Sequence, residues 1–250
     1  MSKRLKNAIL ILLMKNEKIP TKIQSLMLTP IGYAKTDFKE KFGIPRQSGR
    51  AGLRTKIVFY PEFGVEEAFR GLEGFSHIWI LFDFSKSHTD GFSPTVRPPR
   101  LGGNERVGVF ASRSPFRPNP IGLSCVKLLK IEKNKGAGTS LLVEGADLLD
   151  GTPVLDIKPY LPHADCKTDA LGGYAAQVEN HRLQVQFPEE LLSRLEEDKR
   201  EGLKECLADD PRPSYQEEPE RIYSMRFADF DVRFQVQEGV LTVVAMDEIK

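Results

Sequence analysis

The hydrophobic positions of this chain fall into short runs that are separated by turn residues. From about residue 28 the first runs are "PIGYAKT", "KFGIPRQSG" and "KIVFY". Residues 65–70 predict one or two helical turns that end at Gly71. Further runs follow, namely "RVGVFAS", "IGLSCVKLLKIEK", "TSLLVEGADLL" and "TPVLDIKPYL". Short strands with Gly and Pro between them are typical of a β-barrel or a sandwich, which we expect to about residue 165.

One stretch, residues 75–85 ("FSHIWILFDFS"), is apolar and aromatic almost without interruption. A strand with one solvated face would alternate, so this run predicts a strand that is buried on both faces. His77 lies inside it, next to Ile78 and Trp79. That setting favours a histidine packed in the core over a histidine that acts as a base.

The pattern changes after about residue 165. Residues 166–183 are small and polar and predict a linker. Pro188 and the acidic residues after it predict the start of a helix. The apolar positions of this helix are Leu192, Leu195, Leu203, Cys206 and Leu207. Residues 224–249 alternate between polar and apolar and predict a hairpin that turns at Glu238-Gly239. We therefore expect a small α+β accessory domain.

Charge is distributed unevenly along a chain whose net charge is only +1. Between residues 91 and 131 there are seven basic residues and one acidic residue, Glu105. Between residues 186 and 220 there are twelve acidic residues and five basic ones. This asymmetry suits a positive face for an anionic ligand beside an acidic module, although two ordinary surfaces would give the same counts.

Cysteine and histidine are too sparse for a disulfide framework or a zinc site. The three cysteines are Cys125, Cys166 and Cys206, and they form no C-x-x-C pair. The four histidines are His77, His88, His163 and His181, and none has metal-ligand spacing. The sequence thus argues against metal-dependent hydrolysis and fits a reducing cytoplasm.

The apolar run at residues 8–14 ("AILILLM") is too short to span a bilayer, and no small-residue cleavage site follows it. It is a weak candidate for a signal peptide, favoured only by the basic residues ahead of it. Met27 directly precedes "LTPIGYAKT". We expect Met27 to be the natural start and residues 1–26 to be an extension.

Standard catalytic signatures are missing from the sequence. There is no G-x-x-x-x-G-K-[ST] loop, which argues against a P-loop nucleotide hydrolase, and no G-x-S-x-G nucleophile elbow. No glycine-rich fingerprint follows a strand and opens a helix, so a Rossmann-type cofactor site is not supported. A nucleotide-like cofactor would have to bind in another way.

Residues 111–124 ("ASRSPFRPNPIGLS") combine rigidity with polar chemistry. The three prolines fix the backbone and remove donors, so Arg113, Arg117 and Asn119 are presented with little conformational entropy left to lose. Arginine binds phosphate or carboxylate through two nitrogens, and asparagine offers a donor and an acceptor. The simpler alternative is a proline-rich turn whose arginines lie in water.

Two further motifs follow the same logic. "GIPRQSG" presents one cation and one amide on a backbone set by proline, although an ordinary surface loop is the alternative. "DGTPVLDIK" places a tight turn at residues 150–153 before a strand that carries Asp156 and Lys158 on one face. A surface salt bridge would explain that pair equally well.

These motifs together carry a resemblance to a known family. "GVFASRSPFRPNPIGLSCVKL", "DGTPVLDIKPYLP", "FGIPRQSG", "RGLEGFSHIWILF", "PTVRPPRLGGN" and "DPRPSY" resemble the TsaA-like (YaeB/TrmO) family of S-adenosylmethionine-dependent tRNA methyltransferases, over nearly everything from residue 28 onward. The resemblance implies a mainly β fold in which a β-barrel, not a Rossmann sheet, binds the cofactor near a homodimer interface. The implied division is an extension at 1–27, a barrel methyltransferase domain at 28–167 and an α+β accessory domain at 168–250.

The resemblance also implies a reaction and a cofactor site. The reaction is methylation of the exocyclic N6 nitrogen of threonylcarbamoyl-adenosine at position 37 of threonine tRNAs, in the cytoplasm and without a membrane. Carried over position by position, the family's contacts with S-adenosylmethionine fall on Pro45, Arg46, Gln47, His77, Ile78, Arg113, Leu123, Asp150, Gly151, Thr152 and Pro153. In this assignment Asp150 accepts bonds from the ribose or the ammonium group, and Arg46 or Arg113 holds the methionine carboxylate.

The substrate nitrogen bears a carbonyl group and is a poor nucleophile, so removal of its proton should help. The candidates for that step are Asp156, Tyr160 and Lys158, with His77 as a fourth. Arg117 with Asn119 is expected to bind the threonyl carboxylate. Phe116 or Tyr215 is expected to stack on the splayed base. A hypothesis from a different class is a non-catalytic tRNA- or nucleotide-binding module that retains the cofactor pocket.

Overall fold

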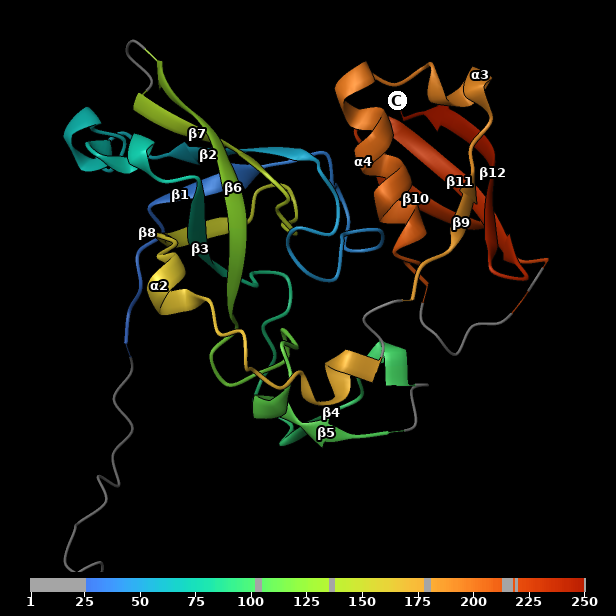
Figure 1. The fold of residues 1–250 in the computed structure, drawn as a ribbon, viewed down its shortest axis with the longest axis horizontal. Helices are drawn as coiled ribbons and strands as arrows, with labels where there is room; N and C mark the ends of the chain where they lie inside the picture. Colours follow the sequence, from blue (N-terminus) through green and yellow to red (C-terminus); the bar gives the residue numbers. More distant parts are fainter. Residues whose placement is uncertain are drawn as a thin grey trace, which may run out of the picture.

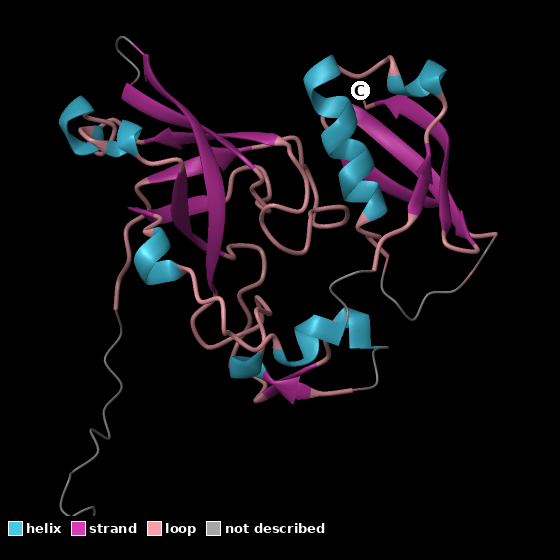
Figure 2. Cartoon of the chain, in the orientation of Figure 1, coloured by secondary structure: helices cyan, strands magenta, loops and turns pink. Residues whose placement is uncertain are grey.

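Two β structures, joined by a segment that packs against both, make up the protein (Figure 1). This computed structural model describes residues 26–101, 105–134, 138–177, 181–212, 218 and 220–249. Strands dominate these residues, and the helices are few and short (Figure 2). The mainly β prediction is confirmed.

The N-terminal structure is a closed barrel with the strand order β1-β2-β7-β6-β3-β8, in which every neighbouring pair is antiparallel. Its strands are β1 (Gly32–Lys35), β2 (Arg54–Phe59), β3 (His77–Asp83), β6 (Ile121–Asn134), β7 (Gly138–Glu144) and β8 (Pro153–Pro159). Alternate residues point inward, where Ile57, Ile80 and Leu141 are fully buried. The spacing of the predicted strands was compatible with a barrel or a sandwich. The pairing of β8 with β1 closes the sheet, so this structure is a barrel.

β3 does not have two buried faces, so the prediction from its unbroken apolar run is wrong. Ile78, Ile80 and Phe82 are buried inside the barrel, while Trp79 and Leu81 between them are only half-buried on the outside. A barrel wall has one interior face, and the outer apolar side chains of β3 are covered only in part. His77 is exposed, so the core-histidine interpretation is also wrong.

Between β3 and β6 the chain leaves the barrel in a long excursion. It carries a two-stranded sheet of β4 (Thr95–Val96) and β5 (Val107–Gly108), which lies below the barrel in Figure 1. The strand expected for "RVGVFAS" is therefore short, because the chain enters a 3-10 helix at Val109–Ala111. The remaining short helices are Glu66–Phe69, Leu72–Gly74, Pro99–Leu101, α2 (Pro162–Asp165) and Gly173–Gln177.

The C-terminal structure is a sheet of order β10-β11-β12-β9, in which β9 runs parallel to β12. Its elements are β9 (Gln184–Gln186), α3 (Glu189–Leu192), α4 (Glu197–Ala208), β10 (Tyr223–Phe227), β11 (Phe230–Gln237) and β12 (Val240–Glu248). The single helix predicted from Pro188 is two helices, interrupted at residues 193–196. The turn at Glu238-Gly239 is confirmed, and both residues have a left-handed φ.

Residues 36–53, between β1 and β2, form what we call the bridging segment. It leaves the barrel and packs into the C-terminal core, where Phe38, Ala51 and Leu53 join α4 and the sheet. The ring of Phe38 meets that of Phe227 edge to face at 5.7 Å. The C-terminal structure is therefore completed by residues of the barrel half, across the division predicted at residue 167.

Three observations bear on the sequence-based exclusions. Within the described ranges, no helix is both long enough and apolar enough to cross a membrane. The same ranges hold no group of His, Cys, Asp or Glu that could bind a metal ion. Cys125, Cys166 and Cys206 are all free thiols.

Candidate active site

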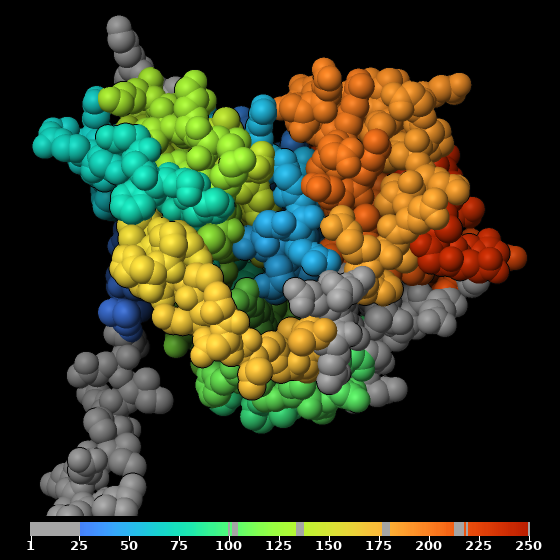
Figure 3. Space-filling view, viewed as in Figure 1, coloured from blue at the N-terminus to red at the C-terminus, as the bar shows by residue number. Residues whose placement is uncertain are grey.

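A cavity of about 700 Å³ lies at the end of the barrel where β3 ends and β6 begins. This volume is within the range of roughly 300–1,000 Å³ that is usual for small-molecule sites. The cavity brings together eight of the residues that the sequence singled out. Those that line it are Pro45, Arg46, Gln47, Arg113, Arg117, Asn119, Leu123 and Thr152. Figure 3 shows the bridging segment, in blue, between the barrel and the orange C-terminal structure.

Two motifs that are far apart in the sequence meet in the cavity wall. Nη1 of Arg113 donates a hydrogen bond to Oε1 of Gln47 at 2.5 Å. Arg117 turns back on its own loop, where Nη1 donates to the carbonyl oxygen of Ser112 at 3.0 Å. The hydroxyl of Ser112 donates in turn to the carbonyl of Val109. The proline-rich loop is thus held at its base and presents two guanidinium groups to the cavity.

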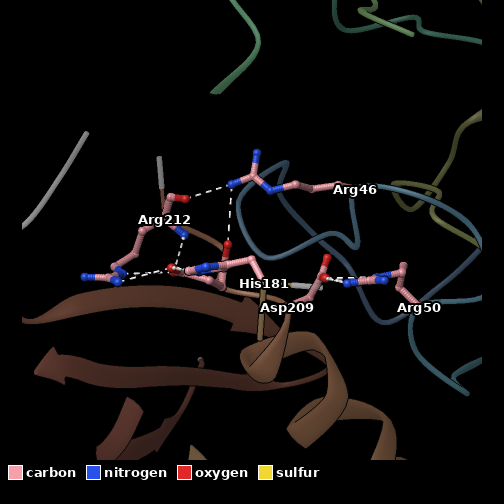
Figure 4. Close-up of polar contacts among 6 residues, drawn as sticks. Arg46, Arg50, His181, Asp209 and Arg212 are labelled. Carbon is pink, nitrogen blue, oxygen red and sulfur yellow. Dashed lines mark hydrogen bonds and ion pairs between the residues drawn. The ribbon is translucent and has the colours of Figure 1, made fainter. Parts of the chain in front are cut away.

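The C-terminal structure holds Arg46, which lies in the bridging segment (Figure 4). Nη2 of Arg46 donates to the backbone carbonyl of Arg212 at 2.7 Å and, more weakly, to that of Asp210 at 3.4 Å. Asp210 is buried and pairs with Arg212 and His181. Burial raises the pKa of Asp210, but hydrogen bonds from Arg212 and His181 outweigh this effect and hold it below its ordinary value. Arg46 therefore serves to anchor the loop.

Asp150 has protein partners on both carboxylate oxygens. Oδ1 accepts a hydrogen bond from the backbone N–H of Thr36 at 2.9 Å, and Oδ2 pairs with Nζ of Lys39 at 2.9 Å. It does not line the cavity, whereas Thr152 in the same turn does. The left-handed φ of Gly151 allows the tight turn between them. Through these two bonds Asp150 fixes the turn beside the cavity.

The structure places another group of predicted residues elsewhere. His77 begins β3 and Asp83 ends it beside the cavity, so at about 3.3 Å per residue some 20 Å separate them. Asp156 and Lys158 lie on the outer face of β8, where they form an ion pair of 2.8 Å. The prediction that these two share a face is confirmed. Ile78 points into the closed barrel and has no exposed surface.

Tyr160 joins His77 and Trp79 in an aromatic cluster at that far end of β3. The centre of its ring lies 6.3 Å from the ring centre of His77 and 5.8 Å from that of Trp79. Nε1 of Trp79 donates to Asp165 at 3.0 Å. Partial desolvation, with the neighbouring Cys166, raises the pKa of Tyr160, so the phenol is protonated at neutral pH.

Of the two aromatic residues expected to stack on a base, Phe116 and Tyr215, the structure describes only Phe116. Phe116 is 52% exposed, at the tip of the proline-rich loop, and does not line the cavity. Tyr215 lies outside the described residues.

Sequence reasoning missed both carboxyl groups in the described lining of the cavity, that of Asp83 and that of Asp147. Asp147 follows β7 in the apolar stretch "GADLL", and Oδ1 accepts a hydrogen bond from the hydroxyl of the buried Ser124. Burial raises its pKa, although the Ser124 hydroxyl and the charge of Arg113 oppose that rise. The signal in the sequence was a charged residue in an otherwise apolar run.

Fold and site define a β-barrel protein with a cation-lined ligand cavity and a C-terminal α+β structure that supports the cavity wall. The family model for the tRNA-methyltransferase O N-terminal domain matches residues 33–166, and the model for the TrmO C-terminal domain matches residues 180–249. The chain belongs to the TrmO family.

Known proteins agree with this assignment. A tRNA (adenine(37)-N6)-methyltransferase of Escherichia coli K12 is 42% identical over 234 residues, which cover 90% of this chain and 99% of that protein. A protein of the same name from Eikenella corrodens is 49% identical, with 69% of this chain and 97% of that one covered. An S-adenosyl-L-methionine-binding protein of Archaeoglobus fulgidus is 39% identical over 56% of this chain and 94% of its own length.

The fold agrees as well. The crystal structure of TrmO from Pseudomonas aeruginosa superposes with a TM-score of 0.73 at 38% identity, and the match covers 91% of this chain and 99% of that one.

Proposed function

We propose that this protein transfers a methyl group from S-adenosylmethionine to the exocyclic N6 nitrogen of threonylcarbamoyl-adenosine at position 37 of threonine tRNAs. Membership of the TrmO family, with relatives that are named tRNA (adenine(37)-N6)-methyltransferases, supports the reaction class. The observation that carries the proposal is a cavity lined by residues of the motifs 45–47 and 113–123 together with Thr152 of the turn at 150–153.

The cavity fits a nucleoside that is joined to an amino acid. Phe82 and Leu123 provide apolar surface for a base, while Gln47, Arg113 and Thr152 provide polar groups. When bound, S-adenosylmethionine supplies an electrophilic methyl group on its sulfonium. The task of the protein is to hold donor and acceptor in line and to exclude water. The anchored loops at Arg46 and Asp150 serve that task because they limit the movement of the cavity wall.

The rim of the cavity suits the modified nucleoside and its tRNA. Arg117 and Asn119 line the cavity next to the exposed Phe116, so we assign the threonyl carboxylate to the first two and base stacking to the third. Lys41 and Lys86 line the same cavity and add positive charge for phosphate groups.

We infer that a second copy of the chain completes the site. The family pattern gives His77 a cofactor contact, but in this chain His77 is exposed at the end of β3 that lies away from the cavity. The outer face of β6 carries Ile121 (39% exposed) and Leu123 (52%), which is apolar surface typical of an interface. A homodimer through this face would bring the outer-face residues of one copy toward the cavity of the other.

The proposed homodimer also gives a place to the residues expected to take the proton from the substrate nitrogen. Asp156, Lys158 and Tyr160 do not line the cavity of their own chain, so we propose that they act across the dimer. Asp156 is the best suited of the three to accept a proton, because the raised pKa of Tyr160 makes its phenolate scarce.

The test is methyl transfer from radiolabelled S-adenosylmethionine to purified threonine tRNA that carries threonylcarbamoyl-adenosine, with the same tRNA lacking the modification as control. Mass spectrometry of the digested tRNA should show a methyl group on the modified nucleoside. A protein that binds the tRNA without turnover would support the non-catalytic module instead. A monomer at micromolar concentration in light scattering would exclude the completed dimer site.

A further inference from the structure

The cavity contains many cations but only two carboxylates among its described lining residues, Asp83 and Asp147. Asp83 is already paired, since its Oδ1 lies 2.7 Å from Nε2 of His88. Asp147 accepts a hydrogen bond from the neutral hydroxyl of Ser124 and forms no ion pair with a described residue. Asp147 is therefore the anionic group that the cavity offers to a cationic ligand.

Arg113 shares the cavity with Asp147 without pairing with it. Both residues line the same cavity. The two described side chains form no ion pair with each other, and Nη1 of Arg113 instead donates to Oε1 of Gln47. A positive and a negative group that face one cavity without touching match the two ends of an α-amino-acid zwitterion, in which the ammonium and carboxylate are separated by one carbon.

The position of Asp147 is well defined by its surroundings. Ser124 belongs to β6 and has no exposed surface. Bulk water therefore cannot take the place of its hydroxyl as the hydrogen-bond donor to Asp147. The left-handed Gly145 two residues earlier is bound to the bridging segment through Gly49, whose N–H donates to the Gly145 carbonyl at 2.8 Å. The carboxylate is thus held against the same segment that carries Gln47.

We propose that Asp147 binds the ammonium group of the methionyl part of the cofactor, while Arg113 binds its carboxylate. Asp147 is then a residue that selects cofactors with an intact amino-acid end. This inference rests on the proposed function, because it takes S-adenosylmethionine as the ligand of the cavity. It adds a residue that none of the family's motifs in this sequence contains.

Calorimetry with the full-length protein and two ligands tests the inference. S-Adenosylhomocysteine carries the amino-acid end, and methylthioadenosine lacks it. The substitution Asp147→Asn keeps the size of the side chain and an acceptor for Ser124 but removes the charge. We expect the Kd for S-adenosylhomocysteine to rise roughly 10- to 100-fold and the Kd for methylthioadenosine to change less than about 2-fold.

The control variant is Asp231→Asn on the outer face of the C-terminal sheet, which makes the same chemical change away from the cavity and should leave both Kd values unchanged. Ser124→Ala should weaken S-adenosylhomocysteine binding less than Asp147→Asn does, because it frees the carboxylate but keeps its charge. Thermal unfolding of each variant checks the fold.

Equal weakening of both ligands, or no weakening of either, would overturn the role of Asp147. A fall in turnover with unchanged S-adenosylhomocysteine affinity would overturn it too and make Asp147 a proton acceptor. If the unaltered protein does not bind S-adenosylhomocysteine, the proposed function fails and this inference fails with it.

Discussion

Arg50 holds the buried carboxylate of Asp209 through two nitrogens, with Nε at 3.0 Å and Nη2 at 2.7 Å from Oδ1 (Figure 4). Arg50 belongs to the bridging segment, three residues after Gln47, and Asp209 directly follows α4 as its C-cap. The C-terminal structure therefore holds the loop that lines the cavity, in addition to its own fold.

Replacement of Arg50 by alanine should lower the free energy of unfolding by about 2–4 kcal/mol, because the side chain of Asp209 is only 5% exposed and would lose its main cation. Denaturant titration measures the loss. The control is Arg54→Ala, whose pair with Asp198 is largely exposed and should contribute less than about 1 kcal/mol. Equal losses for the two variants would contradict the role given to Arg50.

The stability of the protein should fall in acid through Asp210. Its pKa in the folded protein is below the ordinary value, because bonds from Arg212 and His181 outweigh the opposing effect of burial. Its contribution is therefore complete above a pH of about 4 and is lost as the pH falls through the folded pKa. Asp210→Asn, which suits the left-handed φ at this position, should make the acid dependence less steep. Parallel pH curves for the two proteins would refute this.

Gly122→Ala should destabilise the barrel at the cavity. A Cβ at this position would lie 2.2 Å from Cζ of Phe82, its partner on β3. Overpacking of this kind costs about 1–3 kcal/mol. Since both residues line the cavity, S-adenosylhomocysteine should also bind more weakly. Gly74→Ala has no atom within 4 Å and is the matched control, for which the melting temperature should hardly change.

Arg117→Ala should remove the preference for threonylcarbamoyl-adenosine over plain adenosine. If Arg117 binds the threonyl carboxylate, the loss of a charge-assisted bond corresponds to about 1.5–3 kcal/mol in kcat/KM for modified tRNA. Binding of S-adenosylhomocysteine should change much less than kcat/KM, because Arg113 keeps its own bond to Gln47. The comparison uses modified and unmodified transcripts of one tRNA. A proportional loss on both would assign Arg117 to phosphate contacts instead.

Binding of tRNA should weaken steeply with salt, because the cationic rim would displace phosphate counterions. We expect a log-log slope of about one unit for each phosphate contact. Lys86→Ala at the rim should reduce that slope by about one, since Lys86 lines the cavity and its carbonyl, rather than its ammonium, is engaged by Lys41. An affinity that is constant between low and moderate salt would contradict the assignment of the rim to tRNA.

Much of the local structure followed from the sequence because its causes are local. The turns at Gly151 and Glu238-Gly239 and the long strand after Pro120 lie where the sequence placed them. The prediction that both faces of β3 are buried is wrong, because an apolar run does not show which of its faces a barrel will enclose. The prediction of one unbroken C-terminal helix is also wrong. Leu192 and Leu203 keep a helical spacing although the helix is interrupted between them.

The sequence by itself determined the chemistry of the motifs and, through their resemblance to the TrmO family, the class of reaction. Only the tertiary structure decided which motifs share a site. Gln47 and Arg113 are 66 residues apart and meet because the barrel closes, while His77 is carried to the other end of its strand. It also decided that Asp150 holds a turn and that Asp147 lines the cavity. The reason is physical: a side chain's chemistry is set by its type, but its partners are set by long-range strand pairing and packing, which local sequence does not encode.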